Sequence, residues 1–280
     1  MIRYASLIWT ILLISGITSP NFGATFYSET VEREIPVEIV MPSVPKETAR
    51  AIVIYLKGLA EPRAGQVPDA TLIGELTRAG MGVIVVDYEG AANAISPWIN
   101  SDLLNLRQHV SELAAPHLIN SDRVYILPAG YRLARDIEFY RDDRKTYRMD
   151  VRYPALKQTA DTAKVPLIIQ IPHNNDARMN MNSIVKFRDS LLEGLMTCGY
   201  AVAVVAHPVA PPYNGIDPMP ESIYKLKSAV RTLRAESPRF GYDPSKIGVL
   251  GFSRGSGMAG LLAVTSTVTS LETASTSTIA

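Results

Sequence analysis

Apolar residues along the chain follow two patterns that alternate up to about residue 265. Short apolar runs are separated by longer segments in which apolar residues recur at helical spacing. A short apolar run is typical of a strand, and helical spacing is typical of an amphipathic helix. The predicted strands are 29–41, 50–56, 82–88, 122–127, 148–154, 165–171, 200–206 and 247–250. The predicted helices are 69–80, 101–113, 184–199, 222–237 and 258–264.

This alternation predicts an α/β fold. Most of the predicted strands are apolar throughout, so both of their faces are expected to be covered. We therefore predict a mostly parallel β-sheet with helices on both faces, a three-layer αβα arrangement. Residues 29–41 differ, because charged residues alternate with apolar ones and Pro36 favours a sheet edge. A chain of 280 residues has room for one large domain or two modest ones.

The order of these elements occurs twice along the chain. Arg123-Val-Tyr-Ile-Leu-Pro-Ala-Gly aligns with Lys246-Ile-Gly-Val-Leu-Gly-Phe-Ser, an offset of 123 positions. Val83 and Val202, in the second strand of each copy, lie 119 positions apart. In this alignment Gly130 takes the place of Ser253. The pattern indicates either a duplication whose first copy is degenerate, or the rhythm that any two βαβ stretches share.

The charged stretch Arg135–Arg148 separates the two predicted halves. Its charges nearly cancel, so we predict a linker or solvated loop rather than a binding patch. The predicted organisation is an N-terminal α/β region over 24–140 and a second α/β core over 141–265. Residues 266–280 are rich in Ser and Thr, and we expect this tail to be disordered.

Residues 1–23 have the pattern of an export signal. Arg3 supplies a positive charge, Leu7–Ile17 are apolar, and Pro20 then breaks the pattern before a candidate cleavage site at Ala24. The apolar run is short for a membrane span, so no stable span is expected. We predict a secreted or periplasmic protein, with a retained N-terminal membrane anchor as the alternative.

Composition excludes several kinds of site. The net charge of +1 gives no reason to expect nucleic acid as a partner. Cys198 is the only cysteine, so no intrachain disulfide can form, and we expect it to be a core residue. The four histidines lack metal-ligand spacing, and no G-x-G-x-x-G motif follows an early strand, so neither metal nor cofactor is predicted.

The most informative motif is Gly251-x-Ser253-x-Gly255. It lies between the apolar run 247–250 and the predicted helix 258–264. This is the nucleophile-elbow pattern, in which a serine occupies a strained turn between a strand and a helix. Glycines on either side allow close backbone packing, and the helix N-terminus can stabilise developing negative charge. The alternative is a Gly/Ser-rich turn that closes an ordinary βα unit.

From about Tyr147 onward the chain resembles the secreted α/β-hydrolase esterases, a group that includes carboxylesterase-, lipase- and feruloyl-esterase-like enzymes. The resemblance is carried by Arg148–Pro154, Val165–His173, Gly199–Ala206 and Asp243–Gly255, of which the last is the most specific. It implies an α/β-hydrolase fold, incomplete after the elbow, and hydrolysis of a small-molecule or polysaccharide-linked ester. It implies nothing about oligomeric state.

The resemblance also implies roles for individual residues. Ser253 would be the nucleophile, and the backbone N–H of Arg254 one oxyanion donor. The loop at His173 and Asn174 would supply the second donor from the Asn174 N–H. In this loop Asn174 and Asn175 replace the glycines of the family pattern.

The chain departs from the family pattern after the serine. In this family the catalytic acid and histidine follow the serine, but residues 254–280 contain no histidine and no aspartate. His173 and His207 precede the serine, and Glu272 is the one acid that follows it. Three hypotheses remain: a serine esterase whose last third lies beyond residue 280, an inactive hydrolase-like secreted binding protein, and a peptidase of the same fold.

Overall fold

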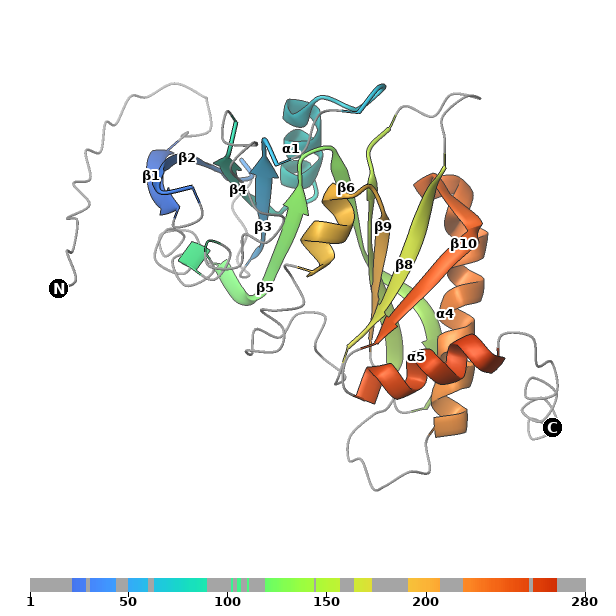
Figure 1. Ribbon diagram of the computed structural model, residues 1–280. Helices are drawn as coiled ribbons and strands as arrows, with labels where there is room; N and C mark the ends of the chain where they lie inside the picture. The colour runs from blue at the N-terminus through green and yellow to red at the C-terminus, as the bar shows by residue number, and fades with distance from the viewer. Residues whose placement is uncertain are drawn as a thin grey trace.

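The computed structural model describes thirteen stretches of the chain (Figure 1). They are 22–28, 31–43, 50–59, 63–89, 102, 105–106, 110, 119–143, 145–156, 164–172, 191–206, 219–251 and 254–265. Within them the chain forms two five-stranded sheets. Helices lie between the sheets and on the outer face of the second sheet (Figure 1).

The first sheet is built from residues 22–128. Its strands are β1 (Phe22–Ser28), β2 (Arg33–Val40), β3 (Arg50–Lys57), β4 (Gly82–Asp87) and β5 (Ile119–Pro128), in the order β1-β2-β4-β3-β5. β2 pairs antiparallel with β1 and β4, whereas β3 pairs parallel with β4 and β5. Helix α1 (Asp69–Arg78) connects β3 to β4.

The second sheet is built from residues 131–251. Its strands are β6 (Tyr131–Arg141), β7 (Thr146–Pro154), β8 (Val165–Ile171), β9 (Ala201–Val205) and β10 (Tyr242–Gly251), in the order β6-β7-β9-β8-β10. β7 pairs antiparallel with β6 and β9, whereas β8 pairs parallel with β9 and β10. A helix over 191–197 connects β8 to β9, and α4 (Met219–Phe240) connects β9 to β10. Helix α5 (Arg254–Thr265) follows β10.

The two sheets have the same topology and the same strand register. In the first sheet Arg50 pairs with Ile119 and Ile52 with Val124, so β5 contains an irregularity between these pairs. In the second sheet Val165 pairs with Tyr242 and Leu167 with Ile247, which is the same irregularity with the same number of residues. The repeated order predicted from the sequence is therefore present in the structure.

The helix ends repeat as well. At the end of α1, Gly80 N–H donates to Thr77 O and Met81 N–H to Leu76 O. At the end of helix 191–197, Gly199 N–H donates to Met196 O and Tyr200 N–H to Leu195 O. Both are Schellman motifs, in which a glycine with positive φ ends the helix; φ is 80° at Gly80 and 99° at Gly199.

Three apolar clusters hold these layers together. The central cluster lies between the sheets, where Leu72 and Leu76 of α1 and Leu192 and Met196 of helix 191–197 meet strand residues of both sheets. A second cluster packs α4 and α5 on the outer face of the second sheet. A third lies on the outer face of the first sheet and includes Val110.

The α/β class predicted from the sequence is confirmed, as are helices on both faces of the second sheet. The proportion of parallel pairing differs from the prediction, because four of the eight described strand pairs are antiparallel. Each of the four antiparallel pairs contains β2 or β7, the strand that precedes the first parallel strand of its sheet along the chain.

The prediction that Cys198 is a core residue is wrong, because its side chain is exposed next to the glycine that ends helix 191–197.

The prediction of a linker over Arg135–Arg148 is wrong. These residues lie mostly in β6 and β7, whose hairpin turn contains Asp142. The buried Lys225 of α4 anchors this turn through an ion pair with Asp142 at 2.8 Å and a hydrogen bond to Tyr147 Oη at 2.9 Å. The charged residues of β6 are tolerated because β6 is an edge strand of the second sheet and most of its residues are half-buried or exposed.

Several sequence-based predictions fall largely outside the described residues. Of the predicted signal, residues 1–23, only Phe22 and Gly23 are described, and they belong to β1. The predicted tail, residues 266–280, lies outside the described residues. The predicted helix 101–113 is described at isolated positions alone. None of the helices in the described ranges combines the length and hydropathy of a membrane-spanning segment.

One buried carboxyl group makes stability depend on pH. Glu193, on helix 191–197, is 2% exposed, and its Oε2 atom has no hydrogen-bond partner among the described residues. Burial raises the pKa of Glu193 from 4.5 to about 8. Between these values the unfolded chain loses the proton while the folded chain keeps it, so rising pH favours unfolding.

We therefore expect the free energy of unfolding to fall between pH 4.5 and 8 and to level off above that window. The loss should be about 1.4 kcal/mol for each unit of pKa difference. Glu193→Gln should remove this decrease, whereas Glu34→Gln, at an exposed position, should not. Urea unfolding at pH 5 and pH 8 measures the effect. Equal pH dependence in the wild type and Glu193→Gln would contradict it.

Candidate active site

The carboxyl ends of the parallel strands β8, β9 and β10 meet at one edge of the second sheet. In open α/β sheets this edge is where ligands bind. β8 ends at Ile171 and β10 at Gly251, and these two residues are paired in the sheet. Two residues separate Gly251 from α5, which lies across the ends of β8 and β10 (Figure 1).

Two glycines allow the close contact between strand and helix at this edge. A Cβ atom on Gly251 would lie 2.1 Å from the carbonyl oxygen of Gly255. A Cβ atom on Gly255 would lie 2.3 Å from the carbonyl oxygen of Ile171 and 2.8 Å from that of Pro172. All of these contacts are to backbone atoms, which cannot rotate away. Position 253 is therefore bracketed by two positions where glycine is required.

The same contacts bring two chemically useful backbone segments together. The first turn of α5 presents N–H groups that have no partner within the helix and carry the positive end of the helix dipole. Gly255, in that turn, lies against Ile171 and Pro172, the last described residues of the β8 segment. The predicted oxyanion loop at 173–174 begins directly after this contact. The arrangement can stabilise a negative charge that develops between the end of β8 and the start of α5.

The predicted site residues are only partly covered by the described residues. Ser253, His173, Asn174 and His207 lie outside them. Arg254 is described as the first residue of α5, which is where a backbone oxyanion donor is expected. The structure thus describes the frame of the predicted site, namely both glycines, the strand ends and the helix start.

One polar residue at this site was missed by the sequence analysis. Gln170 of β8 is 1% exposed, and neither its Oε1 nor its Nε2 atom has a hydrogen-bond partner among the described residues. It immediately precedes Ile171. The sequence feature that could have identified Gln170 is its position as the single polar residue in the otherwise apolar segment Val165-Pro-Leu-Ile-Ile-Gln-Ile.

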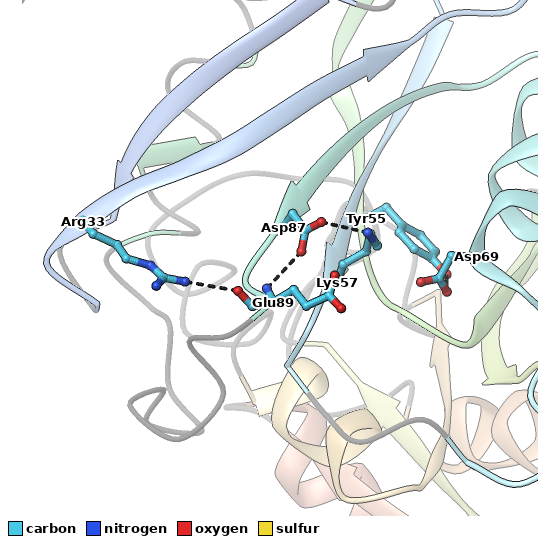
Figure 2. Close-up of polar contacts among 6 residues, drawn as sticks. All are labelled: Arg33, Tyr55, Lys57, Asp69, Asp87 and Glu89. Atoms are coloured by element: carbon cyan, nitrogen blue, oxygen red, sulfur yellow. Dashed lines mark hydrogen bonds and ion pairs between the residues drawn. The ribbon is translucent and has the colours of Figure 1, made fainter.

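The equivalent edge of the first sheet carries different chemistry (Figure 2). Lys57 ends β3 and Asp87 ends β4, and Lys57 Nζ lies 2.8 Å from Asp87 Oδ2. Asp87 Oδ1 also accepts from the Glu89 N–H at 2.9 Å. Arg33 donates to the Glu89 carbonyl oxygen at 3.2 Å. This edge therefore holds a chain of ionic and backbone contacts.

The ionic states of this pair fit a structural role. The hydrogen bond to Asp87 raises the pKa of Lys57. Burial alone would raise the pKa of Asp87, but the hydrogen bonds from Lys57 and the Glu89 N–H outweigh it and lower that pKa. At neutral pH the lysine is therefore a cation and the aspartate an anion. A protonated lysine engaged in an ion pair is neither a nucleophile nor a base.

The position equivalent to Ser253 is closed in the first sheet. Gly130 has a φ of 76°, and a Cβ atom there would lie 2.4 Å from Cδ of Gln66. Its N–H donates to Tyr55 Oη at 3.1 Å, and Tyr55 Oη donates to Asp69 Oδ1 at 2.7 Å. These contacts fix the turn after β5, and its left-handed backbone at Gly130 disfavours serine or any other residue with a Cβ atom.

Comparison with known proteins supports an esterase-type relationship for the second half of the chain. The family model described as BD-FAE, an esterase-type α/β-hydrolase family, matches residues 149–279. No curated protein matches the chain.

Solved structures with similarity to the chain include esterases at low identity. The hyperthermophilic esterase from the archaeon Pyrobaculum calidifontis is 18% identical, with 49% of this chain and 38% of that chain covered and a TM-score of 0.35. Esterase B from Lactobacillus rhamnosis is 18% identical, with 62% and 52% covered and a TM-score of 0.39. A bacterial heroin esterase is 21% identical, with 60% and 48% covered and a TM-score of 0.35. The chain therefore spans between 38% and 52% of the length of these three structures.

Two glycine substitutions in α5 test the strand–helix contact. Gly255→Ala should lower the free energy of unfolding by about 1–3 kcal/mol, because the new methyl group meets backbone oxygens that cannot move aside. Gly260→Ala is the matched control, since a Cβ atom at Gly260 meets nothing within 4 Å. It should stabilise the helix by up to about 1 kcal/mol. Urea unfolding measures both; equal values for the two variants would contradict the packing argument.

A substitution in the first sheet tests the closed position. Gly130→Ser should destabilise the protein by about 1–2 kcal/mol, because a residue with a Cβ atom is forced into left-handed backbone against Gln66. It should not create a second reactive serine. Unfolding curves and labelling of a Ser253→Ala background with a fluorophosphonate probe measure these outcomes. A stable variant that labels at residue 130 would overturn the assignment.

Proposed function

We propose that the protein hydrolyses carboxylic esters of small molecules with Ser253 as the nucleophile, a proposal supported by the match of the BD-FAE family model to residues 149–279. The observation that carries the proposal is the contact of Gly251 and Gly255 at the junction of β10 and α5. Such close packing is what a nucleophile elbow requires, and the motif Gly251-x-Ser253-x-Gly255 supplies a serine at its centre.

The proposed reaction has two stages. Ser253 Oγ attacks the ester carbonyl carbon while a base accepts its proton, and the resulting oxyanion is stabilised by backbone N–H groups at the start of α5. The bond to the alkoxy group then breaks, and the proton passes to the departing alcohol. Water hydrolyses the acyl-serine by the same steps. Arg254 N–H is the first oxyanion donor in this proposal, and Asn174 N–H, in the loop after His173, is the second.

The base that this reaction requires is not supplied by the residues that follow Ser253 in this sequence. Residues 254–280 contain neither histidine nor aspartate. Loss of the base and of the acid that orients it would lower the rate by several orders of magnitude. A second candidate function is an inactive hydrolase-like protein that binds a ligand at the same sheet edge. The N-terminal sequence pattern supports the further proposal that either form is secreted or periplasmic.

A fluorophosphonate probe separates the two candidate functions. An activated Ser253 should be labelled in the folded protein, and Ser253→Ala should abolish labelling. Ser256→Ala, at an exposed position of α5, should leave labelling unchanged. A folded wild-type sample without label would rule out an activated serine and favour the binding protein.

Turnover is a separate measurement. Short p-nitrophenyl esters should be hydrolysed by the wild type and not by Ser253→Ala above the uncatalysed rate. Comparable amide substrates test the peptidase alternative, since the elbow does not specify the leaving group. Equal ester hydrolysis by the wild type and Ser253→Ala would remove this serine from the mechanism.

A further inference from the structure

The last strands of the two sheets, β5 and β10, are equivalent in the repeat but are covered to different degrees. Residues 124–127 of β5 are at most 6% exposed. Their equivalents by strand register, residues 247–250 of β10, are all only half-buried. The neighbouring strands show the same difference, since Val53 of β3 is 0% exposed and its equivalent Ile168 of β8 is half-buried. β10 is therefore less covered than β5.

Part of this less covered region lies on the face of the second sheet that is turned toward the helix layer. Tyr125 of β5 belongs to the central cluster, and its equivalent in β10 is Gly248. Ile168 and Leu250, on the same face as Gly248, belong to none of the three apolar clusters formed by the described residues. Lys246, two residues before Gly248, has a side chain that is 66% exposed. We call these four residues, Ile168, Lys246, Gly248 and Leu250, the open surface of the second sheet.

In the first sheet, the hairpin of β6 and β7 covers β5. Arg152 of β7 donates from Nε to the Ile126 carbonyl oxygen at 3.4 Å, and its guanidinium group lies 6.0 Å from the centroid of the Tyr125 ring. Arg135 of β6 lies over the same ring at 5.6 Å. Burial raises the pKa of Tyr125, and the nearby Asp150 carboxylate of β7 raises it further. The second half thus covers the last strand of the first half with its own first hairpin.

The first half has an equivalent hairpin, formed by β1 and β2. Glu38 of β2 pairs with Val85 of β4 as Asp150 of β7 pairs with Val204 of β9, so Glu38 is the equivalent of Asp150. Glu38 is half-buried, and β1 is the outer strand of its sheet. Figure 1 shows β1 and β10 at opposite ends of the molecule, so this hairpin does not cover β10 of its own chain.

We propose that the β1–β2 hairpin of a second copy of this chain docks on the open surface of the second sheet, as the β6–β7 hairpin docks on β5. Glu38 of one copy then lies near Lys246 of the next, so opposite charges meet across the contact. Ile168 and Leu250 lose their remaining contact with water. The two docking surfaces are different, so the contact is heterologous and copies assemble head to tail. This inference does not depend on the proposed ester hydrolysis.

Sedimentation velocity of the full chain over a range of concentrations tests the proposal. The average sedimentation coefficient of the wild type should rise with concentration and should not stop at the value of a dimer. Glu38→Lys and Lys246→Glu should each weaken association by about tenfold or more, because like charges then meet. The double variant should associate as the wild type does, because opposite charges meet again. Glu34→Lys, at an exposed position of the same strand, is the matched control and should change association little.

An equal mixture of the two single variants should associate as well, because the intact surface of each one meets the intact surface of the other. This result would also show that neither substitution acts by unfolding the chain. A wild type that stays monomeric at about 1 mM would overturn the proposal. So would a double variant that associates no better than the single ones. Association that stops at a dimer, or that neither single substitution weakens, would assign the contact to another surface and would equally overturn it.

Discussion

The parallel pairing of β10 with β8 is the constraint on which the candidate site depends. Because Gly251 pairs with Ile171, both strands end at the same level, and α5 must start directly beside the end of β8. Only glycine at 251 and 255 permits this, since backbone carbonyl oxygens occupy the space of a side chain. The register thus determines which backbone groups can face a reacting carbonyl.

The repeat shows that the same sheet topology can carry different residues at its strand ends. β3, β4 and β5 reproduce the pairing of β8, β9 and β10, yet their edge holds the Lys57–Asp87 ion pair and a glycine where the second half has serine. Tyr55 of β3 accepts a hydrogen bond from Gly130 N–H in the turn after β5 and donates one to Asp69 at the start of α1. The function of each half therefore depends on the residues at its strand ends and not on its topology.

The sequence predicted the parallel strands and the helices because they are apolar in simple patterns, as in Val165–Ile171. It did not predict β6 and the start of β7, because their charged residues resemble a solvated loop until the ion pair of Lys225 with Asp142 is known. At the site, the glycines around position 253 could be identified from spacing alone. Gln170 and Glu193 could not, since each has a buried side-chain atom without a partner among the described residues, and burial depends on the packing of distant segments.

The central cluster joins the half that carries the candidate nucleophile to the half that does not. Leu72 and Leu76 of the first half cover Leu192 and Met196 of the second. Hydrogen bonds also cross between the halves, including Val67 N–H to Ala155 O at 2.9 Å and Arg132 Nε to Glu75 Oε2 at 2.8 Å. Separating the halves would expose apolar area on the helix that leads into β9 and leave these polar groups unpaired. Since β9 pairs with β8, the strand beside the elbow, the first half supports the site through the sheet itself.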